Sequence, residues 1–94
     1  MDLRFYIDPE SSEPHIYEHS VTEREVEQVL SGPGEDSPAN GGARMKLGQT
    51  FAGRFLKIIY VPDESSESAF VITAYELRDK AKAAFRRRRR RKPR

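Results

Sequence analysis

The sequence predicts a small α+β domain in which helices pack on one face of an antiparallel sheet. An alternating apolar segment opens the chain, a capped amphipathic helix follows, and three consecutive strand-like segments then lead into a second amphipathic helix. At 94 residues, the chain has the length of one domain. We place that domain at residues 1–85 and interpret residues 86–94 as an arginine-rich tail that extends the last helix.

The N-terminal third contains a predicted strand, a loop and a helix. Apolar side chains alternate along residues 3–7, which is typical of a half-buried strand, and the prolines and serines of residues 8–14 indicate a loop. Thr22 and Glu25 form a T-x-x-E capping box, in which each side chain binds a free backbone N–H at the start of a helix. Valines at helical spacing and a Gly-Pro pair after them predict a helix over residues 23–31.

The second half of the chain predicts a three-stranded meander and a helix. Residues 31–42 contain four of the six glycines and no large apolar side chain, so we expect a mobile surface loop and no phosphate-binding loop. Strands are predicted at residues 44–51, 54–61 and 69–75, and the last is apolar on both faces, as in a central strand. Helical apolar spacing over residues 77–85 predicts a helix that continues into the arginines.

Composition excludes several functional classes. The chain has no cysteine, which excludes disulfides, thiol catalysis and cysteine zinc sites. No segment approaches the roughly 18 apolar residues of a membrane span. Because no apolar signal segment follows Met1 either, we expect a cytoplasmic protein that does not contact a membrane. The 15 carboxylates are too many for paired-acid catalysis to be argued from sequence alone.

Charge is strongly segregated along the chain. Residues 86–94 carry eight of the 17 basic side chains, whereas residues 1–85 carry a net charge of −6. Residues 44–60 contain four cations and no acid. Six consecutive arginines predict salt-sensitive, sequence-independent binding to RNA. Two alternatives remain open: the tail folds onto the acidic surface of the domain, or it only increases solubility.

Basic and aromatic side chains on the predicted strands are candidate site residues. The stripe formed by Arg44, Lys46, Arg54 and Lys57 would bind phosphates, or would protect exposed strands against aggregation. Tyr60 and Tyr75 offer stacking surfaces for bases, or are core residues with a solvated hydroxyl.

The two histidines are His15 and His19, which lie four residues apart. No further ligand stands at the spacing of a known metal site, so we expect no metal and no other cofactor. His19 precedes the predicted helix, where a neutral imidazole suits a general base or, alternatively, an anchor for the loop.

Three segments combine into a recognisable pattern. They read Pro14-His15-Ile16-x-x-His19-x-Val21-Thr22-x-x-Glu25-Val26-x-x-Val29-Leu30, Arg44-x-x-x-Gly48-x-Thr50-x-x-Gly53-Arg54-x-Leu56-x-x-x-Tyr60 and Val71-Ile72-Thr73-Ala74-Tyr75. In order and spacing, the pattern resembles the BrnT-like toxins of the RelE/ParE superfamily, which belong to bacterial toxin–antitoxin pairs. It is also similar to a related group of small domains for which no activity is established.

The resemblance implies an α+β fold, metal-independent RNA cleavage and a small antitoxin protein as partner. Arg44 and Arg54 would clamp the phosphate, His19 would transfer protons, and Tyr75 stands where the family has an arginine. The ribose 2′-OH is the nucleophile in such a reaction, so the protein needs only to orient it, stabilise the phosphorane and move protons. Further RNA-binding positions would be Lys46, Lys57, Arg78, Arg86, Arg87, Arg88, Arg89, Arg90 and Arg91.

The leading hypothesis is therefore an RNA-cleaving toxin. It requires a cationic hollow between the hairpin of residues 44–61 and the terminal helix, in which Arg44 and Arg54 face the same side and are free of carboxylate partners. The alternative is a non-enzymatic module that binds nucleic acid or another protein.

Overall fold

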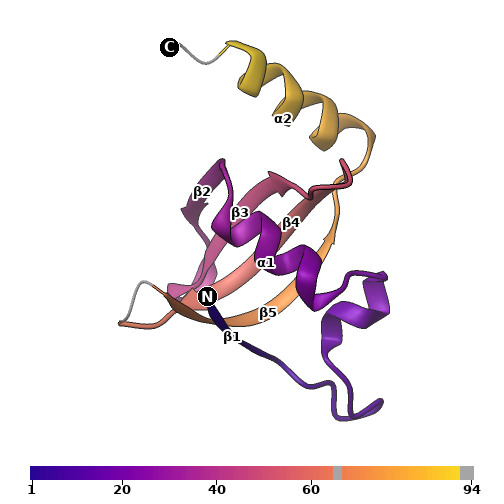
Figure 1. The fold of residues 1–94 in the computed structure, drawn as a ribbon, viewed down its shortest axis with the longest axis vertical. Helices are drawn as coiled ribbons and strands as arrows, with labels where there is room; N and C mark the ends of the chain where they lie inside the picture. The colour runs from indigo at the N-terminus through magenta and orange to yellow at the C-terminus, as the bar shows by residue number, and fades with distance from the viewer. Residues whose placement is uncertain (65–66, 92–94) are drawn as a thin grey trace.

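A five-stranded mixed sheet forms the centre of the molecule (Figure 1). The structure is a computed structural model that describes residues 1–64 and 67–91, with the side chain of residue 91 left out. The strand order is β1-β5-β4-β3-β2. One mixed sheet together with two α-helices confirms the predicted α+β class. The strands are β1 (Asp2–Phe5), β2 (Gly34–Pro38), β3 (Arg44–Gln49), β4 (Phe55–Pro62) and β5 (Ser68–Glu76); the helices are α1 (Glu23–Ser31), α2 (Asp79–Arg91) and the 3₁₀ segments η1 (His15–His19) and η2 (Asn40–Gly42).

Helix α1 begins and ends at the predicted residues. The Thr22 hydroxyl accepts a hydrogen bond from the Glu25 backbone N–H at 3.1 Å, and the Glu25 carboxylate accepts one from the Thr22 N–H at 3.0 Å. Both predicted halves of the capping box are therefore present. Val26 and Val29 are fully buried and belong to the same apolar core as the central strand β4. Burial of these two side chains fixes α1 on one face of the sheet.

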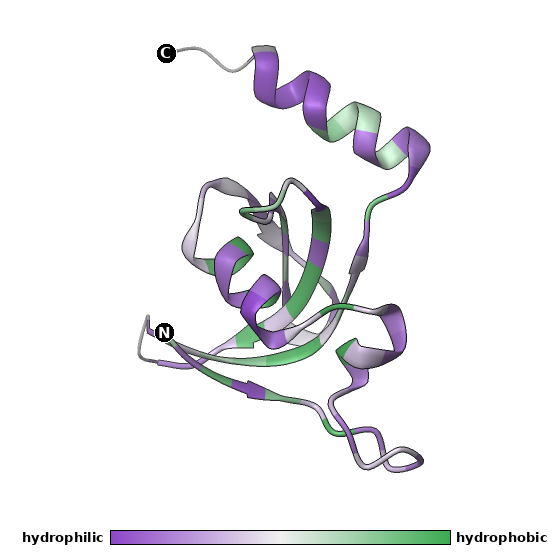
Figure 2. Cartoon of the chain, turned by 45° about the vertical axis from the view of Figure 1, so that its right-hand side comes forward, coloured by the Kyte–Doolittle hydropathy of each residue, from purple (hydrophilic) through white to green (hydrophobic). Residues whose placement is uncertain are grey.

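Both faces of residues 54–61 are equally apolar in the sequence, which therefore does not indicate which face of β4 is buried. Leu56, Ile58 and Tyr60 point to the α1 side and are buried, whereas Phe55, Lys57 and the other alternate residues of β4 are only half-buried. Figure 2 shows that hydrophobic residues lie mainly along the strands, whereas α2 is hydrophilic over most of its length. The second face of the sheet is therefore partly open, and it carries Lys57.

Two features of the sheet differ from the prediction. The sheet is mixed rather than antiparallel, because β1 pairs in parallel with β5, with Asp2 opposite Ser68. The expected mobile loop at residues 31–42 instead contains β2, an edge strand antiparallel to β3. Proline is tolerated on an edge strand, where its missing N–H faces away from the sheet, so Pro38 fits this position.

The arrangement of α2 also differs from the prediction that the helices share one face. This helix lies beyond the end of the sheet, past the β3–β4 turn (Figure 1). Its main apolar contact is the buried Phe85, whose ring meets that of Phe55 edge-on with centroids 6.0 Å apart. Since arginines occupy the distal turns, little apolar surface remains for packing onto the sheet. None of the described helices has the length and apolar character needed to cross a membrane.

We expect Gly34→Ala to destabilise the fold strongly, because β2 and β3 approach closely at Gly34. An added Cβ would overlap the backbone carbonyl oxygen of Leu47 and lie 3.1 Å from Cε of Lys46. A backbone atom cannot move aside as a flexible side chain can, so the free energy of unfolding should fall by about 2–3 kcal/mol. Urea unfolding measures this change, with Ser37→Ala on the same strand as the control. Equal stability of the two variants would contradict the pairing of β2 with β3.

Candidate nucleic-acid interface

A cleft of about 810 Å³ lies between η1, the end of β5 and the start of α2. We call it the histidine cleft, because His15 and His19 both line it. The residues of the cleft come from segments far apart in the sequence. Five residues predicted from the sequence line this one cleft: His19, Arg54, Lys57, Tyr75 and Arg78.

A row of rings runs along one wall of the histidine cleft. The ring centroids of His15 and His19 are 5.4 Å apart, and those of His19 and Tyr75 are 5.7 Å apart. The ammonium of Lys57 lies 5.6 Å from the centroid of the Tyr75 ring. Because the buried Ile16 anchors η1 in the core, the histidines are held against β5. The cleft therefore combines proton-transfer groups, a stacking surface and cations.

Arg54 lies in the cleft but is engaged by protein groups. Its guanidinium pairs with Glu25 at 3.0 Å and with Glu76 at 3.3 Å, and it donates to the Ser20 carbonyl at 2.7 Å. These contacts tie the end of η1 and the start of α1 to the central strands. Arg54 thus positions the cleft wall, and Lys57 and Arg78 are the other cations that line the cleft.

Arg44 is not part of the histidine cleft. It lies opposite Tyr60 in the β3–β4 pairing, whereas Arg54 follows the turn at the other end of the hairpin. Arg54 and Tyr60 are six residues apart, which corresponds to about 20 Å along a strand. Arg44 also pairs with Asp36 of β2 at 2.6 Å. The expectation of one hollow holding two free arginines is therefore wrong. RNA cleavage by a phosphate clamp of Arg44 and Arg54, the form in which the sequence predicts it, fails with this hollow, because both arginines pair with carboxylates.

The opposite end of the hairpin is a closed polar cluster. The buried Tyr60 hydroxyl donates to the Asp36 carboxylate that also accepts from Arg44. Burial and this hydrogen bond raise the pKa of Tyr60 to about 12. Because the three side chains satisfy one another, this cluster stabilises the β2 edge of the sheet.

Lys46 does not form an RNA-binding surface, contrary to expectation. It is only 9% exposed, and its ammonium donates to the carbonyls of Leu30 at 3.1 Å and Gly32 at 2.5 Å. These carbonyls lie at the end of α1, where the helix dipole favours a cation. Burial lowers the pKa of Lys46. The residue is a structural cap for α1.

The arginines of α2 form a second basic surface. Arg88 makes a bidentate ion pair with Glu35, with contacts of 2.7 and 2.8 Å. Arg86 lies 5.9 Å from the centroid of the Phe55 ring, and Arg86, Arg89 and Arg90 line a smaller cleft of about 420 Å³. Within the described part of the chain, Arg87 and Arg90 are exposed and have no acidic partner. Arg91 is the last described residue of α2, and its side chain lies outside the described part of the chain.

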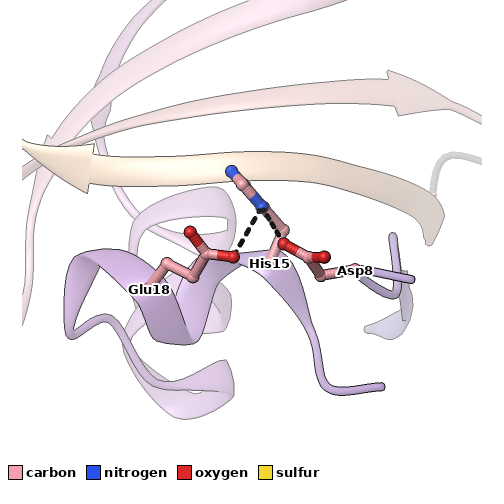
Figure 3. A group of neighbouring side chains, drawn as sticks. All are labelled: Asp8, His15 and Glu18. Carbon is pink, nitrogen blue, oxygen red and sulfur yellow. Dashed lines mark hydrogen bonds and ion pairs between the residues drawn. The ribbon is translucent and has the colours of Figure 1, made fainter. Parts of the chain in front are cut away.

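A cluster that sequence analysis missed supports one edge of the histidine cleft (Figure 3). Nδ1 of His15 lies 3.3 Å from the Asp8 carboxylate and 3.7 Å from the Glu18 carboxylate. The potential metal-ligand atoms of these three residues lie within 4.8 Å of one another. Glu18 shares η1 with His15, but Asp8 comes from a loop, and no spacing rule predicts that this loop turns back to the histidine.

Stability at low pH should depend on Asp8. Hydrogen bonds from Glu18, the Glu10 backbone N–H and His15 lower the pKa of Asp8 from 3.8 to about 2. The native state therefore releases this proton more readily than the unfolded chain does. The stabilisation is complete above about pH 4 and is lost as the pH falls towards 2.

Asp8→Asn is therefore expected to flatten the decline of stability between about pH 4 and 2. Thermal unfolding at a series of pH values measures this decline. Glu10→Gln, an exposed change in the same loop, is the matched control and should unfold with the pH dependence of the wild type. A decline of equal steepness in Asp8→Asn would contradict the assigned role of the carboxylate.

No protein-family model, curated protein or solved structure matches the chain. The functional argument therefore starts from the geometry of the histidine cleft and from the charge of α2. The likeness to BrnT-like toxins stays a prediction from sequence.

Proposed function

We propose that the protein binds RNA through α2 and cleaves it, without a metal ion, in the histidine cleft. The observation that carries this proposal is the convergence of His19, Tyr75, Lys57 and Arg78 on one cleft from η1, β5, β4 and the start of α2. Cleavage of RNA requires a proton acceptor, a proton donor and cations for the phosphate. The cleft holds all of these chemical groups.

The roles of the cleft residues follow from their chemistry. Lys57 and Arg78 neutralise the phosphate, whose charge increases as the phosphorane forms. His19 exchanges a proton with an oxygen of the scissile phosphodiester, and its ring lies 5.7 Å from that of Tyr75. The Tyr75 ring offers a surface on which an unpaired base can stack. Arg54 keeps η1 in place through its carboxylate and carbonyl contacts.

The arginines of α2 supply most of the affinity in this proposal. Arg78, just before α2, and Ala81 in its first turn line the histidine cleft. The later turns of α2 carry Arg86, Arg87 and Arg90. The distance from residue 79 to residue 90 is about 17 Å at the rise of an α-helix. A single strand lying along α2 would therefore pass from the arginines to the cleft. Phosphate contacts of this kind give affinity without base specificity.

Incubation with matched RNA and DNA strands tests the proposal. The full chain is incubated with a single-stranded RNA and the DNA of the same sequence, in EDTA, with and without ribosomes. We expect both strands to bind and only the RNA to be cut, because only RNA carries the 2′-OH nucleophile. The contrary result is RNA that binds as well as DNA but stays intact in every condition. The protein would then be a non-enzymatic nucleic-acid-binding module, which is the second candidate function and is favoured by the arginines of α2.

We place this activity in a toxin–antitoxin pair because of the likeness of the sequence to BrnT-like toxins. Expression of the chain in bacteria should then arrest growth, and co-expression of a small antitoxin encoded beside it should relieve the arrest. Lys57→Gln, which removes a cation from the cleft, should restore growth at an equal level of protein. Normal growth with the wild-type chain at that level would exclude the toxin role but not RNA cleavage.

A further inference from the structure

His15 differs from His19 in how its ring is held. Its Nδ1 faces Asp8 at 3.3 Å and Glu18 at 3.7 Å, and its other ring nitrogen points away from both carboxylates (Figure 3). His15 also lines the histidine cleft. A histidine that is oriented by a carboxylate and presents its second nitrogen to a cleft has the arrangement of a proton-transfer group.

The Asp8 carboxylate is itself fixed by the loop. Asp8 is 8% exposed, and its second carboxylate oxygen accepts a hydrogen bond from the Glu10 backbone N–H at 2.8 Å. The backbone N–H of Asp8 donates to the Glu13 carbonyl at 2.8 Å. The carboxylate cannot turn away from His15 without breaking the loop contacts. The orientation of the ring is therefore built into the fold before any ligand binds.

We propose that His15 is the general base of RNA cleavage and that Asp8 is the residue that positions it. This inference rests on the proposed function. Nδ1–H donates to Asp8, so the lone pair of Nε2 is available in the cleft. The His19 ring, 5.4 Å away by centroid, brings a second nitrogen near the same phosphodiester. An acid and a base at this separation can serve the two oxygens of one transesterification.

The reaction balances without a metal or a cofactor. Nε2 of His15 takes the proton from the ribose 2′-OH, and the 2′ oxygen forms a bond to phosphorus. The bond from phosphorus to the 5′ oxygen breaks, and His19 gives that oxygen a proton. The products are a strand ending in a 2′,3′-cyclic phosphate and a strand beginning with a 5′-OH, so the substrate must be RNA with an intact 2′-OH at the cut.

Several charged or titratable groups surround His15 and enter its pH response. Asp8 and Glu18 face Nδ1, His19 lies beside it on η1, and the Tyr6 ring approaches from the segment after β1 with centroids 6.2 Å apart. From the sheet, β4 and β5 contribute cationic Lys57 and the Tyr75 phenol. Arg54, Glu76 and Arg78 also line the cleft. A base that must be deprotonated gives a rate that rises with pH, and an acid that must be protonated gives a rate that falls. The wild type should therefore show a bell-shaped profile.

The experiment measures cleavage of single-stranded RNA in EDTA as a function of pH for wild type, His15→Gln and Asp8→Asn. Asn keeps an oxygen for the Glu10 N–H but turns an amide towards His15, which favours the wrong tautomer. His15→Gln should cut at least about 100-fold more slowly and lose the acid limb of the profile. Asp8→Asn should also cut more slowly and shift that limb, with RNA affinity unchanged in both. Glu10→Gln is the control with wild-type kinetics.

The outcomes separate this inference from the proposed function. If the wild type cuts RNA and His15→Gln cuts at the same rate with the same profile, the role of His15 is overturned and RNA cleavage stands. If EDTA abolishes cleavage and a divalent metal restores it, the metal-independent reaction is wrong, and the general-base assignment is overturned with it. If the wild type binds RNA but never cuts it, both proposals fail. Loss of rate in Asp8→Asn without a changed pH profile would overturn the positioning role of Asp8.

Discussion

Replacing His19 with glutamine is expected to slow RNA cleavage by about 10²–10⁴-fold. The side chain is exposed and lies in the histidine cleft beside Tyr75, so its loss removes a proton-transfer group without opening the core. The rate should fall in kcat, because the α2 arginines that provide affinity remain in place. Single-turnover cleavage of RNA at saturating protein measures this step directly.

Tyr17→Gln is the matched control for His19→Gln. Tyr17 belongs to the same 3₁₀ segment and is 43% exposed, but its hydroxyl donates to Glu23 and its ring does not line the histidine cleft. We expect this variant to cleave RNA at the wild-type rate. Equal rates for all three proteins would remove His19 from the mechanism, whereas equal losses in both variants would indicate a general disturbance of η1.

Replacing Arg86, Arg87 and Arg90 together with glutamine is expected to weaken RNA binding by about 100-fold at 0.1 M salt. Each contact of a cation with a single strand contributes about 0.7 to the slope of log affinity against log salt, so that slope should become shallower by about 2. Arg88 is left unchanged because it pairs with Glu35 and helps to hold α2. Fluorescence anisotropy with labelled RNA over a salt series measures both quantities.

The control for this variant removes an exposed positive charge from another helix. Arg24→Gln on α1 changes the net charge by the same amount as each single arginine replacement. Arg24 lines neither the histidine cleft nor the smaller cleft beside α2. Its effect on the salt slope should be small compared with that of Arg87→Gln. Similar slopes for these two single variants would mean that RNA responds only to the net charge of the protein.

The sequence predicts those elements whose signals are local. The boundaries of α1 follow from a capping box and a Gly-Pro stop, which act within about one turn of the helix. Strand β2 was missed because Gly34, Asp36 and Pro38 have low strand propensity. It exists because β3 supplies its hydrogen-bond partners and Arg44 pairs with Asp36 across the two strands. A prediction from a window of a few residues cannot detect partners that lie on another strand.

The sequence also predicts only part of the candidate site, because contacts between distant segments decide which side chains are free. Basic and aromatic residues can be identified in the sequence, and five of the predicted ones do line one cleft, although only Lys57 and Tyr75 lie on strands. Which of them are free depends on distant carboxylates and carbonyls: Asp36 engages Arg44, and the end of α1 engages Lys46. The contact between Asp8 and His15 depends on the path of a loop. A charge count cannot distinguish a phosphate-binding lysine from a helix cap.

The parallel pairing of β1 with β5 affects how the chain can fold during synthesis. Residues 2–5 are synthesised long before their partners, residues 68–71, so β1 cannot pair until β5 has been synthesised. The entropic cost of closing such a long loop slows a folding step that needs this contact. The antiparallel pairs β3–β4 and β4–β5 join neighbouring segments, so they form without closing a loop of this length. Docking of the amino-terminal segment then completes the edge of the sheet as a late event.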